Sequence, residues 1–195
     1  MNVFESHRSN IIKSILNRDN NIGLLVTSSA DSKNFCLELN KNKNDLDVQV
    51  LDSSGVYVSM GTKSPFYDKK SITFEELKNQ FHVVLDMENA AIKNLYFDPK
   101  NNYINTNQVL FTNSITCCIS FLLEADAHLY TPLWVLGYFK NLPIHFARLR
   151  DTENVKIPQN HLVLIKRKNE HLTAIELEFI EQLRCKLKAR SPSTC

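Results

Sequence analysis

The stretch Leu110-Phe111-Thr112-Asn113-Ser114-Ile115-Thr116-Cys117-Cys118-Ile119, followed after a short apolar run by His128-Leu129-Tyr130-Thr131-Pro132, is the most informative part of the sequence. We predict a strand-turn-strand unit here, with the turn at Glu124-Ala125-Asp126. The unit places a hydroxyl residue, a cysteine and a histidine in that order, which is an arrangement able to make an activated thiolate. The rest of the chain is interpreted as a scaffold for this unit.

Length and composition are typical of one soluble domain. At 195 residues the chain can bury a sizeable core, so we expect a single domain over residues 1–195. A formal net charge of +2 gives no electrostatic argument for a nucleic-acid partner. No apolar run reaches the roughly 18 residues that a membrane span needs. The polar start Met1–Ser6 also lacks the apolar core of a signal peptide, so we expect synthesis in a cytoplasm without one.

Cysteine and glycine usage excludes several kinds of site. The cysteines are odd in number and form no CxxC pair, so neither a disulfide scaffold nor a structural zinc site is expected; they are Cys36, Cys117, Cys118, Cys185 and Cys195. Four glycines leave no room for a phosphate loop or a dinucleotide fingerprint. No histidine pair has the spacing of metal ligands. We therefore expect no cofactor and no metal.

Hydrophobic periodicity predicts a mixture of helices and strands. An amphipathic helix is expected over residues 5–18, a capping box at Thr73–Glu76 opens a second helix, and Thr173–Glu176 opens a closing helix. Strands are expected at 22–27, 35–39, 46–50, 56–60, 82–87, 91–97, 144–149 and 162–165. The turn Ser53-Ser54-Gly55 indicates a hairpin within an antiparallel meander, and residues 134–139 fit either strand or helix. The expected fold class is α+β, a single domain with a mostly antiparallel twisted sheet or β-sandwich flanked by helices.

The pattern around Cys118 resembles a known family, the cysteine-dependent glutamine deamidases. This family includes the catalytic domain of cytotoxic necrotizing factor, the Burkholderia lethal factor and, more remotely, CheD. The family positions are filled in order by Leu110-Phe111-Thr112, Thr116, Cys118 and His128-Leu129-Tyr130-Thr131-Pro132. The resemblance covers residues 109 to 139, with Cys117 standing where the family usually has glycine.

The resemblance implies an enzyme that acts on a protein. Cys118 would attack the carboxamide of a glutamine side chain, ammonia would leave, and water would release the thioester as glutamate. His128 would lower the pKa of the thiol and shuttle protons, while Thr112 would orient the imidazole. The family further implies a bacterial toxin or effector, a virulence factor made in the bacterial cytoplasm, and we expect a monomer. It would be secreted without a signal peptide and would modify a host protein that carries the target glutamine, in the host cytoplasm.

Two alternatives stay open beside the deamidase. One is a non-catalytic interaction protein on the same scaffold, with Cys118 buried as cysteines in apolar strands usually are. The other is a cysteine hydrolase or protease that uses Cys118 with His145 and Asp151. With a tight turn, the ten-residue interval (128 minus 118) would leave the side chains of Cys118 and His128 too far apart, whereas a bulge or a wider turn would restore their contact. His145 is therefore the second candidate partner. Cys117 is interpreted as core, and the remaining histidines, His7, His82, His161 and His171, as solvated.

Overall fold

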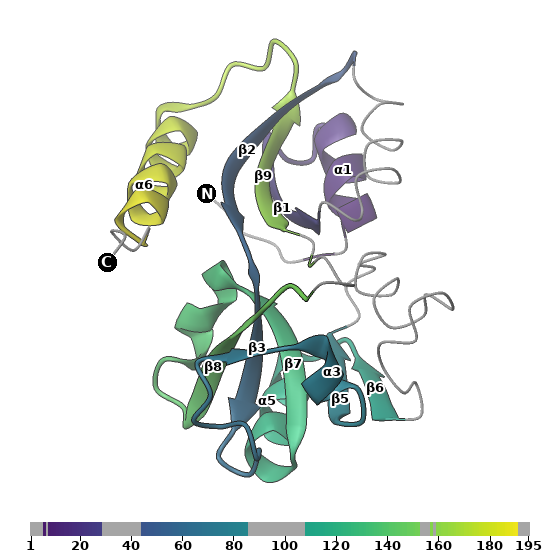
Figure 1. The fold of residues 1–195 in the computed structure, drawn as a ribbon. Helices are drawn as coiled ribbons and strands as arrows, with labels where there is room; N and C mark the ends of the chain where they lie inside the picture. The colour runs from purple at the N-terminus through teal and green to yellow at the C-terminus, as the bar shows by residue number, and fades with distance from the viewer. Residues whose placement is uncertain are drawn as a thin grey trace. The chain divides into compact units, whose positions relative to one another are not determined.

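A computed structural model describes residues 6, 8–28, 44–85, 108–152, 157 and 159–190, which gather into two compact units (Figure 1). Unit 1 contains residues 8–27, 44–53 and 161–190, and unit 2 contains residues 54–85, 108–152 and 159–160. The strands expected at 35–39 and 91–97, together with Cys36, Cys195 and His7, lie outside the described residues. The expectation of one domain over residues 1–195 stays a prediction.

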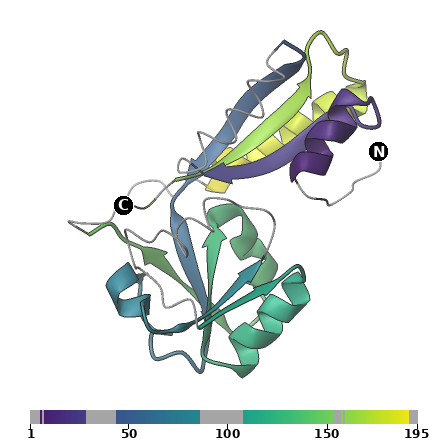
Figure 2. The same cartoon turned by 90° about the vertical axis from the view of Figure 1, so that its right-hand side faces the viewer.

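Unit 1 is a three-stranded sheet with one helix on each face (Figures 1 and 2). The strand order is β1 (Ile22–Ser28), β9 (Asn160–Arg167) and β2 (Leu46–Ser54), so the strand that comes last in the sequence is the central one. Helix α1 (Arg8–Leu16) covers one face and helix α6 (Ala174–Arg190) the other. These helices and strands confirm the elements that periodicity predicts for the same residues.

Helix α1 packs closely on its sheet because a glycine lies beneath it. Its buried Ile12 and Ile15 contact a cluster formed by Leu25, Leu46, Val163 and Ile165. A Cβ atom added at Gly23 would lie 2.7 Å from Cγ2 of Ile11, so only a residue without a side chain allows this approach. Arg167, the last residue of β9, donates hydrogen bonds to the carbonyls of Ile15 and Asn20. It thereby ties the last turn of α1 and the loop that follows it to β9.

Unit 2 is built on a six-stranded mixed sheet. The strand order is β4 (Ser71–Ile72), β8 (Ile144–Leu149), β3 (Val56–Gly61), β7 (Ala127–Pro132), β5 (Phe81–Leu85) and β6 (Val109–Thr112). Its helical segments are α3 (Phe74–Leu77), α5 (Ile115–Glu124) and the 3-10 helix η3 (Leu133–Phe139). The capping box at Thr73–Glu76 is confirmed, and residues 134–139 prove to be helical.

The expected fold class, a mostly antiparallel α+β sheet, is wrong. Of the five neighbouring strand pairs in the six-stranded sheet, β4–β8, β5–β6 and β5–β7 are parallel, and β3–β7 and β3–β8 are antiparallel. Because β6 and β7 flank β5 and run in the same direction, the chain between them must cross over the sheet, and α5 makes that crossover. The fold is α/β with a mixed sheet.

Two cores cover opposite faces of this sheet, as expected for an α/β architecture. On one side, α3 contributes Phe74 and Leu77 to a cluster that contains Tyr130. On the other side, α5 contributes Cys118 and Leu122 to a cluster that contains Leu129. Consecutive residues of β7 therefore point into different cores, and residues 127–131 are all buried.

The predicted hairpin at Ser53-Ser54-Gly55 is also wrong. Strand β2 belongs to the three-stranded sheet of unit 1, whereas β3 belongs to the six-stranded sheet of unit 2. The chain passes from one unit to the other at Ser53 and Ser54. A stretch with the composition of a tight turn is therefore the point at which the chain leaves one sheet for another.

Candidate functional site

The predicted strand through Thr112 and Cys118 is a strand followed by a helix. Strand β6 ends at Thr112, and Ser114 caps α5 by accepting a hydrogen bond from the amide of Cys117 at 3.3 Å. The Thr112 hydroxyl accepts a hydrogen bond from the amide of Ser114 at 3.1 Å. Thr112 therefore stabilises the start of the helix.

Cys118 is a core residue of α5, in an environment that disfavours the thiolate. Its side chain is fully buried in the cluster with Leu122 and Leu129. Burial, with a smaller contribution from Cys117, raises the pKa of the Cys118 thiol to about 11. A reactive cysteine needs the opposite, a lowered pKa that makes the thiolate available near neutral pH. The sequence predicted that Cys117 would lie in the core, but Cys117 is half-buried and Cys118 lies in the core.

His128 lies in β7 and has partners other than Cys118. Its Nδ1 donates a hydrogen bond to the carbonyl of Phe81 at 3.4 Å, so in the neutral ring Nε2 accepts from the hydroxyl of Ser64 at 2.8 Å. Burial lowers the pKa of His128, opposed by the carboxylate of Asp126, 3.9 Å from Nε2. Among the described residues, no hydrogen bond joins His128, Thr112 and Cys118 with one another.

His82, which the sequence suggested to be solvated, is fully buried beside His128. The two residues are register partners in the parallel pair of β5 and β7, with ring centroids 6.0 Å apart. His82 donates a hydrogen bond from Nε2 to the carbonyl of Leu77 at 3.1 Å, and its ring stacks on Tyr130. Burial lowers the pKa of His82 to about 4, so both histidines are neutral at pH 7. A histidine inside a strand of apolar neighbours, as in Phe81-His82-Val83, is the sequence signal that indicates this burial.

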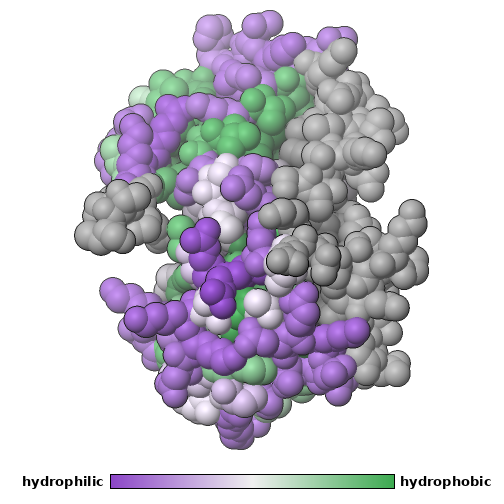
Figure 3. All heavy atoms as spheres, in the orientation of Figure 1, coloured by the Kyte–Doolittle hydropathy of each residue, from purple (hydrophilic) through white to green (hydrophobic). Residues whose placement is uncertain are grey.

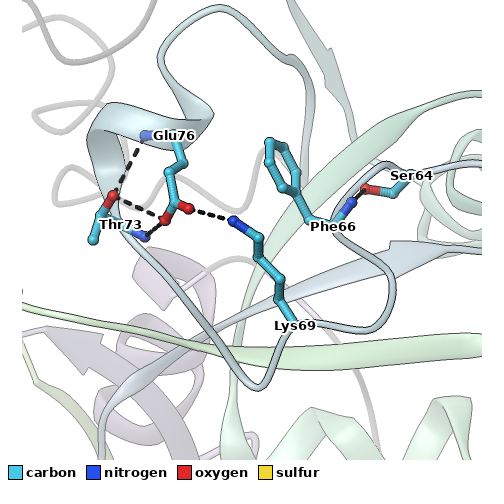
Figure 4. A network of polar contacts seen from close by, with 5 residues as sticks. All are labelled: Ser64, Phe66, Lys69, Thr73 and Glu76. Atoms are coloured by element: carbon cyan, nitrogen blue, oxygen red, sulfur yellow. Dashed lines mark hydrogen bonds and ion pairs between the residues drawn. The ribbon is translucent and has the colours of Figure 1, made fainter.

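A polar network holds the loop that covers His128 (Figure 4). The loop carries Ser64 and Phe66, and the Phe66 ring lies 5.7 Å from the His128 ring. Beyond it, Lys69 forms an ion pair with Glu76, whose carboxylate also accepts a hydrogen bond from the amide of Thr73 at 2.8 Å. The bond from Lys69 holds the pKa of Glu76 below its usual range. The capping box thus anchors the loop to the start of α3.

His145, the second candidate partner, lies on β8 and faces the same loop. It donates a hydrogen bond from Nε2 to the carbonyl of Lys69 at 3.0 Å, and its ring lies 5.6 Å from that of Tyr67. No hydrogen bond in the described part of the chain connects His145 with Cys118. The hydroxyl, thiol and imidazole groups of the sequence pattern thus serve helix capping, core packing and loop anchoring.

Comparison with known proteins identifies the fold. No protein-family model and no curated protein sequence matches the chain. The effector-binding domain of a BenM variant is similar over 94% of this chain and 80% of its own length, with a TM-score of 0.67 and 10% identity. The chain has the fold of a LysR-family effector-binding domain. Full-length OxyR from Pseudomonas aeruginosa, a variant, matches 94% of this chain with a TM-score of 0.68 and 11% identity.

CbnR, a LysR-family transcriptional regulator solved in full length with its target DNA, also has this fold. It matches 92% of this chain with a TM-score of 0.61 and 14% identity. This chain spans 55% of the CbnR chain and 62% of the OxyR chain.

These matches overturn the reading of the chain as a deamidase. The resemblance to glutamine deamidases is wrong, because the fold over nearly the whole chain is that of transcriptional regulators. The predictions of a deamidase, of a host protein as its substrate and of secretion into a host cell are therefore also wrong. The expected set of partners is wrong as well, because a regulator with this fold, CbnR, is solved in complex with its target DNA. That Cys118, His128 and Thr112 form one site stays a prediction, which their separate hydrogen-bond partners do not support.

Proposed function

We propose that this chain is the effector-binding regulatory domain of a LysR-type transcriptional regulator, which binds a small molecule and performs no chemistry on it. The observation that carries the proposal is the match to the BenM effector-binding domain over 94% of this chain and 80% of that domain. The burial and raised pKa of Cys118 agree with a domain that binds a small molecule without catalysing a reaction on it.

DNA recognition is assigned to the part of such a regulator that this chain does not match. In CbnR on its target DNA, the similar region accounts for 55% of the polypeptide. The formal charge of +2 agrees with a domain that senses a ligand and leaves the phosphate contacts to another domain. A regulator of this kind acts on the DNA of the cell that makes it. This location replaces the earlier expectation of action in a host cell.

Within unit 2, the proposed effector contact is at the carboxyl ends of the parallel strands β5, β6 and β7. In open α/β sheets, ligands bind beyond these ends, where helices begin. Here β6 ends in Thr112, and α5 follows with Ser114 at its cap and the exposed Thr116 as its second residue. The amides of a helix N-terminus favour negative charge, so the effector class proposed is a small anion such as a carboxylate.

Thermal unfolding in the presence of a panel of small organic carboxylates tests the function. A ligand at 100 times its Kd stabilises the native state by about 2.7 kcal/mol. For a chain of this size that corresponds to an increase of about 5–10 °C in Tm. An increase with at least one member, saturating with concentration, supports the proposal, and no response to any carboxylate contradicts the proposed ligand class.

The variant Thr116→Glu tests the position of the contact. A carboxylate in the first turn suits the helix dipole, so the variant keeps its fold, yet it repels an anion bound at the same amides. We expect the Kd of the ligand to rise at least about tenfold. Ser120→Glu, one turn further along the exposed side of α5, is the matched control and leaves the Kd within about twofold. Equal effects of the two changes place the effector elsewhere.

A further inference from the structure

The loop between β3 and β4, residues 62–70, is held by two histidines in opposite hydrogen-bonding roles. His145 donates from Nε2 to a backbone carbonyl of the loop at 3.0 Å. His128 instead accepts at Nε2 from the hydroxyl of Ser64 at 2.8 Å, because its Nδ1 donates to the carbonyl of Phe81. A donating imidazole keeps its bond when it gains a proton, whereas an accepting one loses it. Of the two contacts, the one at His128 therefore depends on protonation.

A buried carboxylate oxygen lies beside the accepting nitrogen. Oδ1 of Asp126 is 3.9 Å from Nε2 of His128, whose side chain is fully buried. Among the described residues, no group gives this oxygen a hydrogen bond. A shift of about 1 Å would bring the two atoms to hydrogen-bond distance. A protonated His128 thus has an acceptor next to it that the neutral ring does not use.

The other titratable groups that face this site keep their hydrogen-bonding roles. His82 of β5 lies beside His128 with ring centroids 6.0 Å apart, and burial holds the pKa of His82 at about 4. It therefore stays neutral down to about pH 5. Strand β3 contributes Met60, which carries no charge. Four charged residues of the loop, α3 and α5 form two ion pairs, Lys63 with Glu124 and Lys69 with Glu76.

Protonation of His128 would leave the hydroxyl of Ser64 without its acceptor. The Ser64 oxygen already accepts a hydrogen bond from the amide of Phe66 at 3.2 Å. If the protonated ring donated to the same oxygen, the hydroxyl hydrogen would need a new acceptor, and the described part of the chain offers it none besides Nε2. A buried donor without an acceptor costs free energy. Nε2 therefore turns to Asp126, and the hydroxyl of Ser64 reaches water when the loop opens.

We propose that residues 62–70 form a proton-operated flap, in which His128 takes up one proton from solvent, exchanges Ser64 for Asp126 as its partner and releases the loop. The loop begins after Gly61, beside the amino ends of β5 and β7. The proposed effector contact is at the opposite edge of the sheet, so the flap is independent of the proposed function. Most residues of the loop are exposed, and Figure 3 shows mainly hydrophilic side chains over the end of unit 2 below β3.

The direction of the pH dependence follows from the state that binds the proton more weakly. Burial lowers the pKa of His128 below its ordinary value of 6.5 while the loop is closed, and opening returns the ring toward that value. The closed loop is therefore favoured above about pH 6.5. As the pH falls below this value, the open fraction rises by up to about tenfold per pH unit, until the pH reaches the lowered pKa.

Hydrogen exchange of single amides, followed by NMR on the full chain, measures this opening. The amide of Tyr67 donates to the carbonyl of Ser64 at 3.2 Å, and the amide of Lys69 donates to that of Phe66 at 2.9 Å. Protection factors correct for the intrinsic pH dependence of exchange. For these two amides they should fall by up to about tenfold per pH unit between about pH 6.5 and pH 5. They should also stay below the protection of Val58 in central β3, which reports global unfolding.

Two matched substitutions separate the flap from global unfolding. His128→Gln keeps an oxygen that can accept from Ser64 but cannot take up a proton, so the pH dependence of the loop amides should vanish. Val58 should keep its own pH dependence in this variant, because His82 still titrates on unfolding. His145→Gln makes the same change at the donating histidine and should leave the pH dependence of the loop unchanged.

Asp126→Asn tests the second partner of His128 without a change in the core. Loss of the carboxylate removes the charge that favours the protonated ring, so the fall in loop protection should begin about one pH unit lower. Asp68→Asn removes the same charge from an exposed position of the loop and should leave the onset unchanged.

Three outcomes overturn the proposal. The first is loop protection that does not change with pH in the folded, unmodified chain. The second is loop protection equal to that of Val58 at every pH, since the loop would then open only with the whole unit. The third is a pH dependence that survives in folded His128→Gln. If circular dichroism shows that this variant does not fold, Asp126→Asn decides, and an unchanged onset there overturns the proposal.

Discussion

Acidification should destabilise this protein through His82. The folded state holds the pKa of this ring at about 4, because the ring is buried, whereas the unfolded chain has the ordinary value of 6.5. Below pH 6.5 the unfolded chain therefore binds a proton that the folded chain excludes until the pH approaches 4. Stability falls across this window as the pH falls, and a difference of 2.5 units corresponds to about 3 kcal/mol. The lowered pKa of His128 acts in the same direction.

Urea unfolding at a series of pH values between 7 and 4 measures this effect. The variant His82→Gln removes the titrating group and keeps a nitrogen able to donate to the carbonyl of Leu77. We expect the fall in unfolding free energy from pH 6.5 to pH 4 to be about 3 kcal/mol smaller in the variant. Carboxylates such as Glu76 are present in both proteins, so their contribution cancels in the difference.

His171→Gln is the matched control because His171 is exposed. It should reproduce the pH dependence of the unmodified chain. If His82→Gln shows that same dependence, the argument that burial excludes the proton from His82 is refuted.

Three further results are expected. Gly61→Ala should lower the unfolding free energy, measured by urea titration, by about 3 kcal/mol or more, because its Cβ would lie 1.8 Å from a backbone oxygen of α5. Gly55→Ala is the control: the nearest atom to its Cβ would be 4.0 Å away, so the unfolding free energy should change by less than about 0.5 kcal/mol. Native Cys118 should resist iodoacetamide at pH 8 while the exposed Cys185 reacts, as peptide mass spectrometry will show; rapid labelling of Cys118 would contradict its burial. Thr73→Ala should cost about 1 kcal/mol in urea unfolding through loss of the capping box, and an unchanged midpoint would show that the cap is dispensable.

Individual helices could be predicted where their own residues show apolar spacing or a capping box. The spacing of Ile12 and Ile15 predicts α1, and the capping boxes at Thr73 and Thr173 mark the starts of α3 and α6. The failure at residues 115–124 has a physical reason. A short apolar run has no periodicity that separates a buried strand from a buried helix. The capping role of Ser114, with Cys118 and Leu122 four residues apart on the buried face, is the signal that would have indicated the helix.

Strand pairing and the site could not be derived from local signals. Nothing within Phe81–Leu85 or Val109–Thr112 indicates that these strands run parallel, because direction depends on the path of the chain between them. The deamidase pattern matched residue types in the right order, but in the structure Thr112 lies at a helix cap, Cys118 in a core and His128 against a loop. A short pattern of common residues constrains the order of side chains and leaves their placement free.

The order of strands in unit 1 has a consequence for synthesis on the ribosome. Its central strand β9 is made more than 100 residues after β2 begins at Leu46, and β1 and β2 each pair with β9 and not with each other. Unit 2 draws almost all its residues from one uninterrupted stretch, 54–160, and so can fold while the rest is still being translated. Unit 1 must wait, with the apolar residues of α1, β1 and β2 uncovered until residue 167 leaves the exit tunnel. The three-stranded sheet of unit 1 therefore forms late in synthesis, after every strand of unit 2 has been made.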